Sequence, residues 1–143
     1  MKIVFTKNSG LVSRIVRFII RGPYSHCGVV INGYNYQALP SKGVFKEPYV
    51  QDSEKWDELI IEGLDEEKAL KFIAGEMGCG YDYMGAARFL IPFLKPSKKN
   101  WFCSELSGKM LQEAGWDNQD PAWKFNPSNL YFILTKTCKC NVK

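Results

Sequence analysis

The segment SHCGVVINGYNYQAL, residues 25–39, constrains the fold more than any other part of the sequence. Its first half is rich in β-branched residues and runs into Asn32 and Gly33, a pair that favours a tight turn between antiparallel strands. We therefore expect a β-hairpin. Its first arm covers residues 25–33, and its second arm continues through residues 34–48.

Changes in hydrophobic period predict the other elements of an α+β chain, in which an antiparallel sheet packs against helices. Strands are expected at residues 2–6, 57–64 and 130–137, and helices at residues 11–21, 64–78, 80–93 (broken at Pro92) and 104–115. Residues 94–100 and 116–129 are expected to be loops. No repeat or linker divides the chain, so residues 1–143 form a single domain.

The helix predicted at residues 11–21 has two unlike faces. Its apolar face is formed by Leu11, Val12, Ile15, Val16 and Ile19, and its basic face by Ser13, Arg14, Arg17 and Arg21. Such a helix packs its apolar stripe on a sheet or lies on a membrane surface, and the first interpretation is favoured.

Composition excludes several classes of protein. A net charge of +4, with basic and acidic residues interleaved, does not indicate a nucleic-acid partner. The amino terminus has no secretory pattern, and no apolar run reaches the roughly 18 residues of a membrane span, which indicates a chain made and retained in the cytoplasm. The five cysteines show no framework spacing and are expected to be free thiols, with Cys138 and Cys140 exposed in a tail.

Cys103 is the first candidate for chemistry. It stands in WFCSELSGKML, directly before the helix predicted from Ser104. The free N–H groups and positive dipole end of a helix amino terminus favour a thiolate, and the same N–H groups can bind the oxyanion formed when sulfur attacks a carbonyl. The alternative is a buried, inert cysteine.

His26 and Gln37 complete the candidate site. His26 is the single histidine, near the start of a predicted strand, where its imidazole can reach a neighbouring helix end and pair with a thiolate. Gln37, on the second hairpin arm, can accept the ring N–H and orient the ring. Each residue also has an ordinary structural interpretation, His26 as a satisfied core histidine and Gln37 as a surface glutamine.

Other chemistries have weaker support. The cysteines and the single histidine lack the paired spacing of structural zinc sites, so no metal is expected. There is no glycine-rich phosphate loop, and the carboxylates show no paired spacing for acid and base roles.

The segments SRIVRFIIRGPYSHCGVVI, NYQALPSKGV, GCGYDY and WFCSEL occur in an order that resembles the permuted NlpC/P60 papain-like superfamily, especially its YaeF/YiiX-like amidase branch. This resemblance covers most of the chain and implies a circularly permuted papain-like fold, in which the histidine strand precedes the cysteine helix. It implies Cys103 as nucleophile, His26 as base and Gln37 as the orienting residue. On the same grounds, Tyr24 and Ser104 belong to the substrate or oxyanion side.

The resemblance implies a cysteine peptidase or amidase that needs no cofactor. Its substrate would be a peptide, a peptidoglycan fragment or an acyl-amide. Two alternatives remain open: a lipid-directed acyltransferase or phospholipase, with the basic helix touching a membrane, and a binding module that performs no turnover.

Overall fold

A six-stranded antiparallel sheet forms the centre of the molecule, with the strand order β4-β3-β2-β1-β5-β8. The computed structural model describes residues 1–7, 11–52, 54–89, 91, 99–137 and 140–142. The strands are β1 (Lys2–Thr6), β2 (His26–Ile31), β3 (Tyr34–Leu39), β4 (Gly43–Pro48), β5 (Trp56–Ile61) and β8 (Cys140–Val142). A separate pair of short parallel strands consists of β6 (Gly80–Tyr81) and β7 (Asn100–Trp101). The predicted α+β class with an antiparallel sheet is therefore confirmed.

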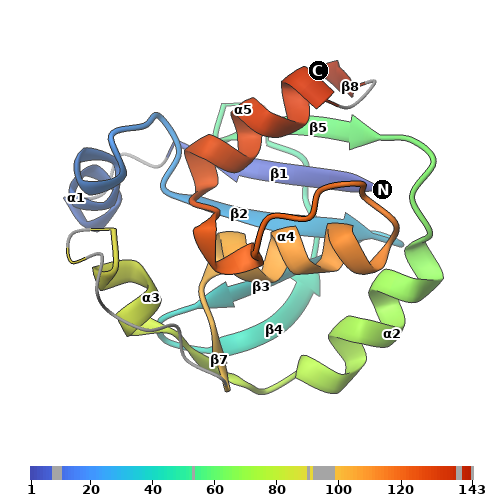
Figure 1. Cartoon of the computed structure of the whole chain (residues 1–143), viewed down its shortest axis with the longest axis horizontal. Coiled ribbons are helices and arrows are strands. Elements are labelled where there is room, and N and C mark those ends of the chain that lie inside the picture. The colour runs from blue at the N-terminus through green and yellow to red at the C-terminus, as the bar shows by residue number, and fades with distance from the viewer. Residues whose placement is uncertain (8–10, 53, 90, 92–98, 138–139, 143) are drawn as a thin grey trace.

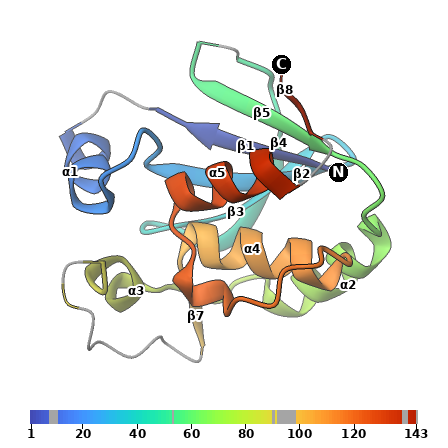
Figure 2. The same cartoon turned by 45° about the horizontal axis from the view of Figure 1, so that its top comes forward.

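The helices gather on one face of the sheet and at one end of it (Figure 1). They are α1 (Leu11–Ile20), α2 (Glu66–Glu76), α3 (Tyr83–Ala87), α4 (Cys103–Glu113) and α5 (Pro127–Thr137), with a short 3-10 turn, η1 (Ala122–Lys124). Both views place α4 and α5 over the sheet and α1 and α3 beside the end where β2 begins (Figures 1 and 2). No helix among the described residues has the length and apolar character needed to cross a bilayer.

The predicted hairpin is present as β2 and β3. Asn32 and Gly33 both have positive φ angles, 51° and 77°, as a type I′ turn requires. The predicted second arm is in fact two strands, because the chain turns between Leu39 and Gly43. Gly43 has φ +67°, and a Cβ there would lie 2.2 Å from the Cys79 carbonyl oxygen, so glycine is required where β4 begins.

The core lies between the sheet and its covering helices. Alternate residues of the strands point into it, as the period of two demands, among them the fully buried Phe5, Cys27 and Val29. From the helices, Leu106 and Leu130 meet them. The resulting packing fixes α4 against β2 and β3.

The opposite face of the sheet is crossed by the connection from β4 to β5. Because β4 is an edge strand and β5 lies beyond β1, this connection must pass over the intervening strands. Its first residue, Tyr49, donates its backbone N–H to the Gly33 carbonyl at 2.8 Å and its hydroxyl to Glu58 on β5. Asn35 and Gln37, which alternate along β3 with the core residues Tyr36 and Ala38, are buried on this face.

Two helices agree with the sequence prediction. In α2, Asp65 caps the first turn by accepting the Lys68 N–H at 3.1 Å, and the helix ends before Gly78. Helix α4 starts at Cys103 and ends before Gly115. The predicted strands at residues 2–6 and 57–64 are confirmed as β1 and β5.

The strand predicted at residues 130–137 is wrong, because this segment belongs to α5. Pro127 begins the helix, and the side chains and backbone N–H groups of Asn126 and Asn129 bond reciprocally at 2.7 and 2.8 Å, which closes its first turn. Leu130 and Leu134, four residues apart, are both fully buried. This capping and spacing outweigh the β-propensity of Tyr131, Phe132 and Ile133.

Three other expectations need correction. The predicted helix at residues 80–93 is divided into β6 and the shorter α3, while Pro92 lies outside the described residues. Cys140 begins β8, paired with Ile61, instead of lying in a tail, and Cys138 is outside the described residues. The apolar stripe of α1 is not fully packed on the sheet, since Ile15 is 50% exposed.

Candidate active site

Cys103 is the first residue of α4. It follows Phe102, whose extended backbone (φ −84°, ψ 150°) marks the helix boundary and whose side chain provides no cap hydrogen bond. The first N–H groups of a helix have no partner within it, so the Cys103 sulfur lies beside a set of hydrogen-bond donors. Only 1% of Cys103 is exposed, because α4 packs on β2.

His26 begins β2, directly opposite Thr6 of β1. Gln37 comes from β3, where the register Val29 to Tyr36 places it diagonally across from His26 on the same face. The His26 Nε2 lies 2.6 Å from the Gln37 Oε1. The structure therefore brings together the histidine and glutamine selected from the sequence.

Glu47 fixes the orientation of the Gln37 amide. The Gln37 Nε2 donates to the Glu47 Oε1 at 2.6 Å, and an ionised carboxylate can only accept. The amide oxygen must then face His26, which makes the His26 Nε2 the nitrogen that carries the ring proton. The other nitrogen, Nδ1, is left to exchange a proton with a thiol.

The pKa shifts of Cys103 and His26 are linked. Burial by itself would raise the pKa of Cys103, but hydrogen bonding from Cys27 and the charge of His26 lower it well below the ordinary thiol value. Burial would lower the pKa of His26, yet the charge of Cys103, together with hydrogen bonds to Cys103 and Gln37, raises it. Both shifts favour a thiolate beside an imidazolium.

Cys27 is a part of this site that the sequence analysis did not identify. It follows His26 on β2, so its side chain points to the opposite face, toward α4, and is fully buried. Its Sγ lies 3.6 Å from the Ser107 Oγ, and it also bonds to Cys103. Burial is the main cause that raises the pKa of Cys27 well above its usual value, and the bond to Cys103 adds to it. Cys27 therefore remains a neutral thiol. The alternation of side chains along a strand is the sequence signal that could have identified Cys27 as a core residue of this site.

Tyr24 and Ser104 both make contacts within the protein. The Tyr24 hydroxyl donates to Asp57, and its ring packs against Tyr131 with centroids 4.6 Å apart. Ser104 is fully buried, and its hydroxyl donates to the Phe125 carbonyl at 2.6 Å. The Ser104 hydroxyl is therefore engaged within the protein, and the assignment of Tyr24 and Ser104 to the substrate or oxyanion side stays a prediction.

Tyr81 also lies near the Cys103 sulfur. Burial is the main cause that raises the pKa of Tyr81, and the negative charge of Cys103 adds to it. The Tyr81 ring meets that of Phe102, the residue before Cys103, with centroids 5.8 Å apart. The sequence marked Tyr81 only as part of the landmark GYDY.

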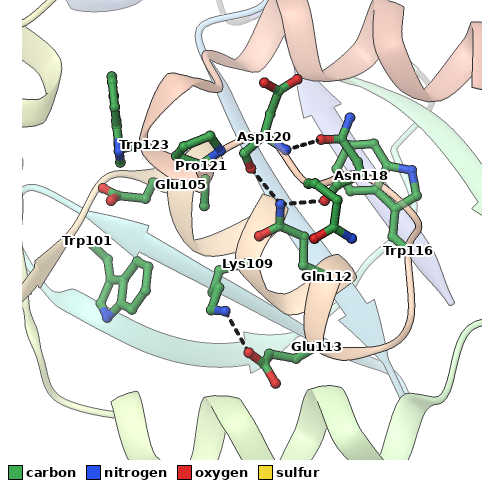
Figure 3. A pocket seen from close by; sticks show the side chains of 12 residues that line it. Trp101, Glu105, Lys109, Gln112, Glu113, Trp116, Asn118, Asp120, Pro121 and Trp123 are labelled. Atoms are coloured by element: carbon green, nitrogen blue, oxygen red, sulfur yellow. Dashed lines mark hydrogen bonds and ion pairs between the residues drawn. The ribbon is translucent and has the colours of Figure 1, made fainter.

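A cavity of about 480 Å³ runs along the flank of α4 (Figure 3). Gln112 closes one end of it by donating to the carbonyls of Asn118 and Asp120 at 2.8 and 2.7 Å. Lys109 and Glu113 form an ion pair at its rim, 2.6 Å apart. Its lining includes neither Cys103 nor His26, so it is distinct from the thiol site.

A second cavity, of about 770 Å³, lies between α1 and the segment after α3. It is lined by Phe18, Ile19, Ile20, Arg21, Phe89 and Asn126. The Phe89 ring contacts Phe102, next to Cys103, with centroids 5.7 Å apart. The contact between Phe89 and Phe102 therefore links this mostly apolar cavity to the start of α4.

Among the residues that the structure describes, no three histidine, cysteine or acidic side chains are grouped so as to hold a metal ion. No protein-family model and no curated protein matches the sequence. The assignment of a function therefore depends on the chemistry of the thiol site itself.

Proposed function

We propose that this chain is a cysteine-dependent hydrolase that cleaves an amide or peptide bond through an acyl-thioester, on a circularly permuted papain-like fold of the NlpC/P60 superfamily. The observation that carries the proposal is the connected series Cys103, His26, Gln37 and Glu47, in which each polar group has a defined partner. A structural histidine would need neither a thiolate neighbour nor an amide held in one orientation.

The reaction follows from this arrangement. His26 takes the proton of Cys103, and the thiolate attacks the carbonyl carbon of the substrate. The N–H groups at the start of α4 stabilise the resulting oxyanion. His26 then protonates the leaving amine, and a water molecule, deprotonated by His26, releases the acyl group from sulfur.

The experiment is a side-by-side screen of native protein and Cys103→Ala. Peptides, peptidoglycan fragments and acyl-amides are incubated with each protein, and released amines are measured. Native protein is expected to turn over at least one class, and Cys103→Ala none, while its circular dichroism spectrum is unchanged. Turnover that survives in Cys103→Ala contradicts a thiol mechanism.

The apolar cavity between α1 and Phe89 favours a second candidate, thiol-dependent acyl transfer or hydrolysis on a lipid. A fatty acyl chain would occupy such a cavity better than a polar peptide. Phospholipids in the same screen test this candidate, with released fatty acid as the readout. A non-catalytic binding module is the remaining alternative, and it requires ligand binding without any turnover.

A further inference from the structure

The amino-terminal third of the chain has an unusual distribution of charge. The first acidic residue is Glu47, whereas seven lysines and arginines precede it. The modest overall charge of +4 conceals this asymmetry, because the acidic residues all lie further along the chain. Helix α1 therefore stands in a segment that is strongly cationic in its own right.

The exposed face of α1 combines cationic and apolar side chains. Arg14 and Phe18 are four positions apart on α1, so they share one side of the helix, and Ile15 borders Phe18 at the same side. Arg21 is exposed and follows directly after the last residue of the helix, with φ 50°. Phe18 is 85% exposed and Ile15 is 50% exposed. We call these four residues the α1 surface.

Among the residues that the structure describes, the α1 surface has no internal partner that explains it. Within the described parts of the chain, no carboxylate pairs with Arg14 or Arg21; Arg17 donates to the Lys7 carbonyl at 3.2 Å. The half-buried Val16, Ile19 and Ile20 face the rest of the protein instead. Burial of the apolar Phe18 and Ile15 side chains would lower the free energy of the protein in water. Their exposure side by side therefore indicates that a membrane or a partner covers them.

We propose that the α1 surface docks on an anionic phospholipid bilayer. Phe18 and Ile15 would enter the boundary between headgroups and acyl chains, and Arg14 and Arg21 would lie against lipid phosphates. A second copy of the chain fits less well, because it would bring the same arginines together. A nucleic acid would engage the arginines but would leave Ile15 and Phe18 unused.

Docking in this way would orient the candidate active site. Only five residues separate the end of α1 from His26, and Phe18 also lines the apolar cavity that reaches Phe89. Both views show α1 beside the end of the sheet where β2 begins (Figures 1 and 2). The docked protein would thus turn its thiol site toward substrates held at the membrane.

Vesicle co-sedimentation tests the proposal. Vesicles of phosphatidylglycerol and phosphatidylcholine should bind the protein, whereas vesicles of phosphatidylcholine alone should bind it much less. Raising the salt from about 0.1 to about 0.5 M should weaken binding, because it screens the arginines. Phe18→Ser should weaken binding roughly tenfold or more, and Arg14→Ala/Arg21→Ala about 25-fold, near fivefold for each arginine.

Matched variants outside the α1 surface control for general effects. Phe132→Ser removes another half-exposed aromatic, and Lys68→Ala/Lys71→Ala removes two charges from α2. Both should bind vesicles like native protein. Equal losses in the control variants, or no binding to anionic vesicles, overturn the proposal. So does binding to a nucleic acid that persists in Phe18→Ser while vesicles are ignored.

The outcome is separate from that of the proposed hydrolase. Cys103→Ala should bind vesicles as well as native protein does, since Cys103 is not part of the α1 surface. Vesicle binding without any hydrolytic activity would leave the docking proposal intact and contradict only the proposed function. Hydrolysis of soluble amides without vesicle binding would do the reverse.

Discussion

Gln37 accepts from His26 with its amide oxygen, at 2.6 Å, while its amide nitrogen donates to Glu47 at the same distance. The two bonds assign every polar atom of the amide a role, so the side chain cannot flip without losing both. This relationship determines which nitrogen of His26 is free to act as a base. In the proposed mechanism, Gln37 would position the imidazole and would not itself touch the reacting atoms.

Replacing Gln37 should separate its positioning role from a structural one. Gln37→Ala should slow the reaction of iodoacetamide with Cys103 by about 10- to 100-fold at pH 7, because the ring loses its orientation. Gln37→Glu keeps an acceptor oxygen and should recover much of the rate. Glu47→Gln can accept from Gln37 or donate to it, so it no longer enforces one orientation and should slow the reaction, though less than Gln37→Ala. Native-like alkylation of Gln37→Ala would contradict the positioning role.

Cys27 should tune the acidity of Cys103. Hydrogen bonding from Cys27 helps lower the pKa of Cys103, so Cys27→Ala should raise that pKa. The pH profile of Cys103 alkylation, followed by mass spectrometry of the labelled peptide, should then shift to higher pH. Cys79→Ala is the control, since Cys79 bonds to Glu76 at 3.5 Å instead. An unshifted profile in Cys27→Ala would show that His26 alone sets the acidity.

The sequence predicted the parts of the fold that local chemistry determines. The turn at Asn32 and Gly33 needs positive φ at both positions, and the Asp65 cap needs only residues within one helical turn. The failures arose where tertiary contacts decide. The segment from Leu130 has β-forming residues, but the burial of Leu130 and Leu134 under the sheet selects the helix.

The candidate site was likewise predictable from the sequence only where local chemistry identifies its residues. Cys103 and His26 carry their own chemical signal, and Gln37 follows from hairpin register. The contact of Glu47 with Gln37 could not be predicted in the same way, because it requires β4 to pair with β3. That pairing depends on a turn before Gly43 that the sequence analysis did not expect. The contacts of Tyr24 with Asp57 and of Ser104 with Phe125 could not be predicted, because these partners are distant in sequence.

Ser104 should matter for stability and not for the thiol. Ser104→Ala leaves the Phe125 carbonyl without its 2.6 Å donor in the core, which should lower the free energy of unfolding by about 1 to 3 kcal/mol in urea titrations. The exposed Ser41→Ala should change it by less than about 0.5 kcal/mol. Cys103 alkylation should be unchanged in folded Ser104→Ala, and a large loss of reactivity would show that the Ser104 hydroxyl also acts on the thiol.

Two helical glycines provide a matched test of the packing of α4. A Cβ at Gly108 would lie 2.4 Å from the Phe125 ring, whereas a Cβ at Gly75 on α2 would meet nothing within 4 Å. Gly108→Ala should therefore destabilise the protein by about 1 to 3 kcal/mol, through overpacking. Gly75→Ala should stabilise it by about 0.5 to 1 kcal/mol, through helix propensity. Thermal unfolding of the two variants measures both signs, and stabilisation by Gly108→Ala would contradict this packing.

Glu105, two residues after Cys103, should make stability depend on pH. Burial raises the pKa of its carboxyl from 4.5 to about 7, although Arg88 opposes the shift. Between these two values the unfolded chain ionises while the folded chain keeps its proton. The stabilisation is thus complete below pH 4.5, where both states are protonated, and is lost as pH rises through about 7.

Glu105→Gln replaces the titrating carboxyl with an amide that does not ionise, so it removes this contribution to the pH dependence of stability. Its free energy of unfolding relative to native protein should increase by about 2 to 3 kcal/mol between pH 4 and pH 8, measured by urea titration at each pH. Glu113→Gln, at an exposed position of the same helix, should change by less than about 1 kcal/mol over this range. A pH-independent difference for Glu105→Gln would mean that the carboxylate is already ionised in the fold, balanced by Arg88.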